Sequence, residues 1–217
     1  MALTRAKLEE LIAAGEIEVG GGGVNPNILH NWDWRNNPVN QRNVSGTITS
    51  SGYFYDRWYA YAANSLTINS GYVACTKTIE QRIEGLGLAG KVATFSMMVD
   101  NVVYAKTLTF PSTTGSVASG VNMPTAIIFF HDTTDMRVRI NAPSTELNYQ
   151  AFKLELGTVS TLAYDPPMDH AVELLKCQRF YQLRSVNNVA AEDMRPLMRI
   201  TNPTITGTGP YAYSADL

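Results

Sequence analysis

Charge is sparse in this sequence, and long apolar runs are absent. Only 17% of the 217 residues are charged, and the formal net charge is −2. Lysine and arginine never form a run of more than two residues, so the basic footprint of a nucleic-acid-binding protein is missing. The longest apolar run, Ala126 to Phe130, is much too short to span a bilayer. We therefore expect neither nucleic-acid binding nor membrane insertion.

Cysteine and histidine are also scarce. Cys75 and Cys177 are the only two cysteines and lie far apart, which excludes a disulfide framework and predicts two buried free thiols. The three histidines, His30, His131 and His170, do not have the spacing of zinc ligands. The start of the chain is charged and has no apolar segment, so we expect no secretory signal. The composition gives no indication of a metal site.

No catalytic signature is present. Residues 131–135 place His131 beside Asp132 and Asp135, but such a stretch is typical of a polar turn between strands. Glycosidases need two facing carboxylates, and nothing marks such a pair here. The glycines of residues 85–90 match GxGxxG, yet a strand-like segment follows where a nucleotide site needs a helix. We therefore expect no catalytic residue, no cofactor and no enzymatic activity.

Short apolar runs separated by turn residues fill the middle of the chain. Hydrophobic residues make up 45% of the sequence, which is enough for one sizeable core. The runs recur about every ten residues and are rich in β-branched and aromatic side chains, a pattern typical of an all-β sandwich or jelly roll. The expected strands cover residues 46–50, 53–62, 66–68, 71–76, 91–99, 102–110, 125–130, 136–140 and 149–156.

The first 23 residues differ from the rest and are expected to form a separate attachment segment. Residues 4–14 predict a short helix with an apolar stripe of Leu8, Leu11 and Ile12, and Gly20 to Gly23 predict a flexible tether. A helix this short needs a partner surface, so we expect the stripe to dock on a larger protein. The sequence thus divides into an N-terminal foot with its linker, residues 1–23, and one β domain, residues 24–217.

A second helix is expected near the C-terminus. Asp169 can cap a helix that runs to about Gln182, with an apolar face of Ala171, Leu174, Leu175 and Tyr181. Residues 195–206 then predict a late strand.

An aromatic run at residues 53–61 carries the candidate binding residues. Because alternate residues of a strand share a face, Phe54 and Trp58 are expected to point into the core. The opposite face would carry Tyr53, Tyr55, Arg57, Tyr59 and Tyr61. Tyrosine combines a flat apolar ring with a polar tip, which suits a subunit contact, internal packing or a ligand platform. The sequence leaves these three roles open.

Five motifs in order resemble the jelly-roll receptor-binding domains of bacteriophage fibre proteins. They are NPVNQR at residues 37–42, DRW at 56–58, KLELG at 153–157, LLKCQRFYQ at 174–182 and MRITNPTIT at 198–206. The resemblance covers residues 25–206 and implies a jelly roll similar to carbohydrate-binding modules, usually trimeric, at the tip of a virion appendage. In related carbohydrate-binding jelly rolls, an acidic corner helps to hold calcium. Here Arg35 occupies a Glu-like position beside Asp33, so no calcium is expected, although Asp33 and Glu155 could contribute.

The resemblance implies a bacteriophage virion structural protein that adheres to the bacterial surface through glycans. Such a protein would assemble in the host cytoplasm as a homotrimer and be exposed on the particle, attached by residues 1–23 to a capsid, baseplate or fibre protein. One alternative is a decoration protein that binds no ligand. Another is a glycan depolymerase built on the same scaffold.

Overall fold

The computed structural model describes residues 25–119, 122–184, 204–206 and 211–215. The expected N-terminal helix, with Leu8, Leu11 and Ile12, and the glycine tether lie outside the described residues. Most of the expected late strand at 195–206 also lies outside them. Within the described part, no helix is long and apolar enough to cross a membrane.

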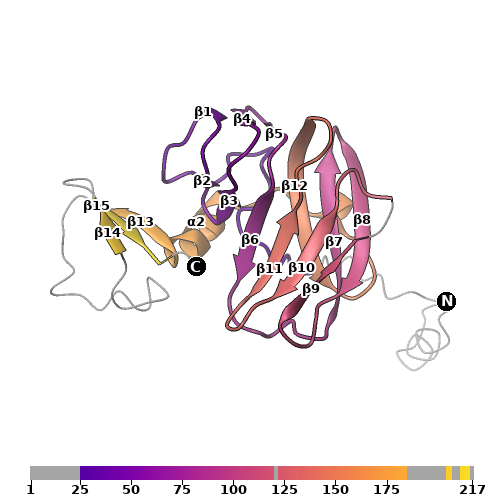
Figure 1. The fold of residues 1–217 in the computed structure, drawn as a ribbon. Helices are drawn as coiled ribbons and strands as arrows, with labels where there is room; N and C mark the ends of the chain where they lie inside the picture. Colours follow the sequence, from indigo (N-terminus) through magenta and orange to yellow (C-terminus); the bar gives the residue numbers. More distant parts are fainter. Residues whose placement is uncertain (1–24, 120–121, 185–203, 207–210, 216–217) are drawn as a thin grey trace, which may run out of the picture.

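Two antiparallel sheets of six strands each form a sandwich, which confirms the predicted all-β fold (Figure 1). The first sheet has the order β1 (Gly46–Ile48), β4 (Leu66–Asn69), β5 (Tyr72–Cys75), β12 (Leu147–Leu156), β7 (Val92–Val99) and β8 (Val102–Thr109). The second has the order β2 (Gly52–Tyr55), β3 (Trp58–Ala60), β6 (Ile79–Ile83), β11 (Met136–Ile140), β10 (Ile127–His131) and β9 (Gly115–Ala118). The chain crosses repeatedly between the sheets, as in a jelly roll.

Strict alternation of buried and half-buried residues explains which face of the second sheet packs against the core. In β11, Met136, Val138 and Ile140 are buried, while Arg137 and Arg139 are half-buried on the outer face. Strand β10 follows the same pattern, since alternate positions point to opposite sides of a sheet. The outer face of this sheet is therefore a surface of arginine, tyrosine and phenylalanine.

Three strand predictions need correction. Strands β6 and β9 were not expected, and the predicted strand at 53–62 is a hairpin of β2 and β3. The chain reverses at Asp56 and Arg57, with Arg57 in the left-handed region at φ 73°. Such a backbone is uncommon for a residue with a side chain, and here no Gly or Asn marks the turn in the sequence.

Trp34 lies at the centre of the aromatic core. Its ring meets four others edge to face at centroid distances from 4.7 to 5.6 Å: Phe54, Tyr55, Trp58 and Phe152. The prediction that Phe54 and Trp58 point into the core is confirmed, because both are fully buried. Edge-to-face contacts of this kind add to the free energy gained from burial alone.

Asn31 is completely buried and forms hydrogen bonds with Trp34, Val39, Asp56 and Trp58. Its side-chain Nδ2 donates to the carbonyls of Val39 (2.8 Å) and Asp56 (3.0 Å), and its Oδ1 accepts from the Val39 amide (2.7 Å). Its backbone carbonyl accepts from both indoles, Trp34 at 3.0 Å and Trp58 at 2.9 Å. Every polar group of the Asn31 side chain thus has a buried partner.

Helix α2 (His170–Gln178) begins where predicted but ends earlier and turns a different face inward. The Asp169 side chain accepts hydrogen bonds from the Ala171 and Val172 amides at 2.9 and 3.2 Å, so the predicted cap is confirmed. The buried side chains are Glu173 and Cys177. The expected apolar face is wrong at Ala171 and Leu175, which are both exposed, Leu175 by 66%. The reason is that Glu173 turns inward to accept from the Asn31 amide at 2.7 Å.

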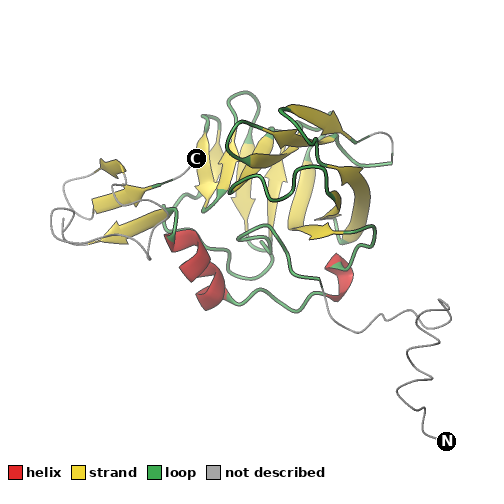
Figure 2. Ribbon diagram, turned by 90° about the horizontal axis from the view of Figure 1, so that it is seen from below, coloured by secondary structure: helices red, strands yellow, loops and turns green. Residues whose placement is uncertain are grey.

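The chain after α2 forms a small antiparallel sheet set apart from the sandwich. It has the order β13 (Tyr181–Arg184), β15 (Tyr211–Ser214) and β14 (Thr204–Thr206), so the predicted helix to Gln182 is wrong at its end. Helix α2 lies between this sheet and the sandwich (Figure 1). The short helix η1 (Leu162–Tyr164) lies at the opposite end of the molecule (Figure 2).

Replacing Asn31 by alanine is expected to lower the free energy of unfolding by about 3 kcal/mol or more, because several buried backbone groups lose their partners. Denaturant titration measures this loss. Asn101→Ala is the matched control. Asn31 and Asn101 both have a positive φ (64° at Asn101), but Asn101 is exposed. The control should lose about 1 kcal/mol. Equal losses in the two variants would show that the backbone conformation, and not the buried hydrogen bonds, determines the effect.

Candidate functional site

A hollow of about 320 Å³ lies on the outer face of the second sheet, beside the β2–β3 hairpin. It is lined by Tyr53, Arg57, Tyr59, Tyr61, Glu80 and Arg82. Four of the five residues expected to form a polar aromatic face are therefore brought together. Its volume is at the lower end of the range of about 300–1,000 Å³ that small-molecule sites occupy.

Three tyrosines form one wall of the hollow, each ring edge-on to the next. The centroids of Tyr53 and Tyr59 are 5.3 Å apart, and those of Tyr59 and Tyr61 are 5.2 Å apart. Tyr53 and Tyr59 are directly paired across the β2–β3 hairpin, and Tyr61 lies two residues further along the same face. All three are half-buried, so ring surface is left for a ligand. We refer to them as the tyrosine ladder.

Tyr55 does not belong to this face, so its assignment as a binding residue is wrong. It is 4% exposed and packs against Trp34 and Phe54 in the core. The pairing of β2 with β3 shifts register between Tyr53 and Tyr55, and Tyr55 pairs with Trp58. This irregularity interrupts the alternation, and Tyr55 turns inward.

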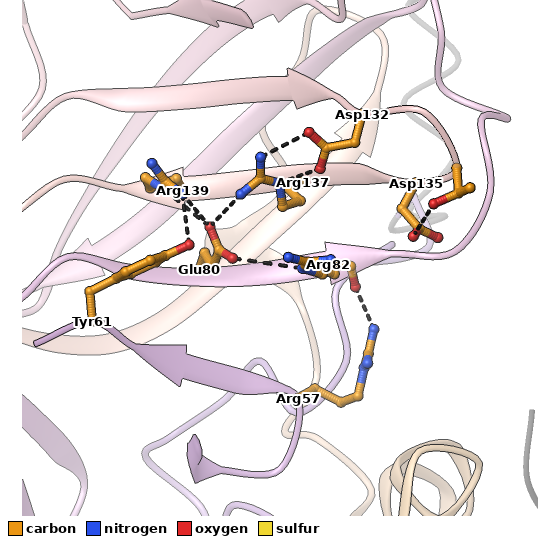
Figure 3. Close-up of polar contacts among 9 residues, drawn as sticks. Arg57, Tyr61, Glu80, Arg82, Asp132, Asp135, Arg137 and Arg139 are labelled. Carbon is orange, nitrogen blue, oxygen red and sulfur yellow. Dashed lines mark hydrogen bonds and ion pairs between the residues drawn. The ribbon is translucent and has the colours of Figure 1, made fainter. Parts of the chain in front are cut away.

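Glu80 occupies the floor of the hollow and contacts three arginines (Figure 3). Its Oε2 is 3.0 Å from Arg139 Nη2 and 3.3 Å from Arg137 Nη1. Its Oε1 is 3.8 Å from Arg82 Nε, too far for a hydrogen bond. The pairing of β6 with β11 sets this arrangement, since Glu80 lies opposite Arg139 and Arg82 lies opposite Arg137.

The two arginines of β11 are held in place by aromatic rings and by a second carboxylate. The Arg139 guanidinium lies 4.7 Å from the ring centroids of both Tyr61 and Phe130, and its Nη2 donates to the Tyr61 hydroxyl at 2.7 Å. Arg137 makes a two-point contact with Asp132, at 2.5 and 2.8 Å. Guanidinium groups fixed in this way lose little freedom when a ligand binds beside them.

Arg57 closes the hollow at the hairpin turn. Its guanidinium stacks on the Phe180 ring at 3.4 Å and donates to the carbonyl of Arg82. The preceding residue, Asp56, is buried and accepts from the Gln41 amide (3.2 Å) and the Gln41 side chain (2.5 Å). Residues 37–42 and 56–58, two of the motifs behind the fibre resemblance, are thus in direct contact.

The corner with Asp33 and Glu155, the two carboxylates considered as calcium ligands, contains basic side chains. Asp33 accepts from Arg35 Nε and Nη2 at 2.8 and 3.0 Å. Glu155 accepts from the Thr161 amide and hydroxyl at 2.7 and 2.8 Å. Lys153 is fully buried beside it and donates to Asp165 at 2.5 Å. Among the described residues, no group of three or more His, Cys, Asp or Glu side chains is placed to hold a metal ion.

The other stretches singled out in the sequence have structural roles. Residues 131–135 form a turn between β10 and β11, as predicted: His131 Nδ1 is 2.9 Å from the Pro111 carbonyl, and Asp135 accepts from the Gly85 amide at 3.3 Å. Cys75 and Cys177 are buried free thiols, which confirms that prediction. Residues 85–90 connect β6 to β7, so a strand follows the glycines.

Glu80, Arg82, Arg137 and Arg139 were not among the site residues predicted from the sequence. A signal for them was present, because the charged residues occupy alternate positions in both segments, Glu80 and Arg82 in residues 79–83 and Arg137 and Arg139 in residues 136–140. This pattern places the charged residues on one face of each strand. It does not reveal that the two strands are neighbours, which is what brings Glu80 next to the arginines.

When the chain is compared with protein-family models, with curated proteins and with solved structures, none of them matches it. Its function is therefore inferred from the side chains of the hollow.

Removal of the Glu80 charge tests the ion-pair cluster. Glu80→Gln leaves three guanidinium groups without their shared counter-ion and is expected to lower the free energy of unfolding by about 1–3 kcal/mol, since Glu80 is buried but the arginines are partly exposed. Denaturant titration gives the value. Glu146→Gln removes the same charge from an exposed position and should change stability by less than about 0.5 kcal/mol. A neutral effect of Glu80→Gln would show that the arginines need no counter-ion.

His30 lies in a second hollow, which shares Arg57 and Arg82 with the first. Burial, and then the positive charges of Arg57, Lys176 and Arg179, lower the pKa of His30 to about 3. The folded protein therefore keeps this imidazole neutral at pH values where the unfolded chain protonates it.

Stability is expected to fall as the pH drops below about 6.5 toward 3, because the unfolded chain then binds a proton that the folded protein does not. His30 contributes a slope of up to about 1.4 kcal/mol per pH unit in this range. His30→Phe removes this contribution, so its free energy of unfolding should depend less on pH than that of the wild type. Equal slopes in denaturant titrations at several pH values would contradict the assignment.

Proposed function

We propose that this protein is a bacteriophage virion structural protein that adheres to the bacterial surface by binding a glycan in the hollow. The observation that carries the proposal is the tyrosine ladder, Tyr53, Tyr59 and Tyr61, standing over charged side chains in one small concave site. Aromatic faces stack on the C–H faces of sugar rings, and the neighbouring polar groups can pair with hydroxyls. A glycan uses both kinds of contact at once.

The rigidity of the site supports binding at low entropic cost. Arg139 is stacked on Tyr61, Arg57 is stacked on Phe180, and Glu80 is buried beneath them. Side chains that are already fixed lose little conformational freedom on binding, which favours affinity in a small contact area. A single site of this size would still bind weakly. Three copies in a homotrimer, and many trimers on one particle, would raise the overall affinity through effective concentration.

The five motifs that resemble phage fibre domains support the placement of this protein on a virion. In this proposal, residues 1–23 attach the domain to a capsid, baseplate or fibre protein, and the β-sandwich is exposed on the particle. Hydrolysis of the glycan is not part of the proposal. A glycosidase uses two carboxylates, and among the described residues only one, Glu80, lines the hollow, where it is paired with arginines.

The test is binding of the purified full-length protein to bacterial cells and to an array of bacterial glycans. Tyr59→Ala removes the central ring of the ladder and is expected to weaken binding about tenfold or more, as the loss of a buried aromatic contact does. Tyr59→Phe keeps the ring and should retain most of the binding.

Tyr164→Ala is the matched control, because Tyr164 is 79% exposed and does not line the hollow. It should bind like the wild type, and unchanged denaturation midpoints would show that all variants fold. Failure of the wild type to bind any cell or glycan would favour the decoration protein. Binding that is insensitive to Tyr59→Ala would show that the adhesive surface lies elsewhere on the protein.

A further inference from the structure

Positive charge exceeds negative charge around the hollow, although the whole chain carries a formal net charge of −2. Four guanidinium groups, those of Arg57, Arg82, Arg137 and Arg139, lie in or beside it. Two carboxylates, Glu80 and Asp132, pair with them. Among these described residues, four guanidinium groups therefore stand against two carboxylates.

Glu80 makes no hydrogen bond to Arg82. One oxygen of Glu80, Oε2, is shared between Arg137 and Arg139, and only the other oxygen faces Arg82, at 3.8 Å. Within the described residues, this is the one charged contact of the Arg82 side chain, which is 37% exposed. A planar guanidinium in this position can still give a two-point hydrogen bond to an anionic group.

The arginine and the rings lie within reach of one ligand. Arg82 and the tyrosine ladder line the same hollow, so an anionic substituent at Arg82 would place the attached ring against a tyrosine face. Burial, followed by contact with Glu80, raises the pKa of Tyr61, so its hydroxyl stays protonated at neutral pH. The site thus offers donors and apolar ring faces to a ligand that carries negative charge.

We propose that the glycan bound in this hollow is acidic, with a carboxylate or phosphate group on the sugar that pairs with Arg82. This inference rests on the proposed glycan-binding function and adds the chemical class of the ligand. Single-stranded nucleic acid also combines rings with negative charge, but its binding grooves follow the backbone with a stripe of basic residues. Here two basic residues among those described, Arg57 and Arg82, line a single hollow of about 320 Å³.

The experiment uses the full chain on an array of bacterial glycans that carry carboxylates, phosphates or no charge. The bound glycans are expected to be acidic, and the class that binds identifies which anionic group Arg82 pairs with. Affinity should fall as NaCl is raised, because salt screens the interaction. The strongest binder is then titrated against the wild type and three variants.

Arg82→Gln is expected to raise the Kd about tenfold or more, because it removes a charge-assisted hydrogen bond. Arg82→Lys keeps the charge but not the two-point geometry, so its Kd should lie between those of Arg82→Gln and the wild type. Lys91→Gln removes one positive charge from an exposed residue outside the hollow and should leave the Kd unchanged. Equal denaturation midpoints would confirm that each variant is folded.

Each of the following outcomes would overturn one of the two proposals or both. If only neutral glycans bind and Arg82→Gln binds like the wild type, the acidic ligand is wrong and glycan adhesion stands. If no glycan binds at all, the proposed function fails together with this inference. If a single-stranded oligonucleotide competes with equal affinity and is also lost in Arg82→Gln, the ligand is a nucleic acid and not an acidic glycan.

Discussion

The fold depends on one buried asparagine, Asn31, because it joins segments that are distant in the chain. Its side chain binds the backbone at Val39 and Asp56, its carbonyl binds both core tryptophans, and its amide binds Glu173 of helix α2. The β-sandwich alone would leave the segment before β1, the hairpin turn and α2 without fixed positions relative to one another. A fully satisfied buried polar cluster specifies one arrangement of such segments, since any other leaves polar groups unpaired.

The contacts of Asn31 extend to the turn that forms the edge of the hollow. Asn31 binds the carbonyl of Asp56, and the next residue, Arg57, takes the left-handed conformation that reverses the chain. The reversal brings Tyr53 and Tyr59 side by side, and Arg57 forms the edge of the hollow. On the other side, Phe180 lies beneath the Arg57 guanidinium just after α2. The segment before β1 and the end of α2 therefore support the same turn from two directions, which lets a strained backbone persist at the edge of the hollow.

Patterns that depend on one strand could be read from the sequence, whereas contacts between strands could not. The Asp169 cap follows from local chemistry, and the burial of Phe54 and Trp58 was predicted correctly although the alternation is interrupted between them. The turn at Arg57 could not be predicted, because it has no Gly or Asn and is held by distant partners such as Phe180. For the same reason Tyr55 was placed on the wrong face. The inward position of Glu173 also could not be predicted from the apolar residues of the helix, because its partner, Asn31, is far away in the sequence.

The two clusters of basic and acidic side chains in this protein show different relations between charge and burial. At the corner near Lys153, Lys153 meets Asp165 at 2.5 Å and Arg35 meets Asp33 at 2.8 Å, while Glu155 lies 3.9 Å from Lys153 and accepts hydrogen bonds from Thr161. At the hollow, Glu80 is shared among three arginines, and Arg82 is left at 3.8 Å. A cluster that served stability alone would give Arg82 a closer carboxylate partner, because desolvated like charges repel one another. Local departures of this kind are expected where a surface must accept another molecule, and here the departure coincides with the exposed tyrosine rings.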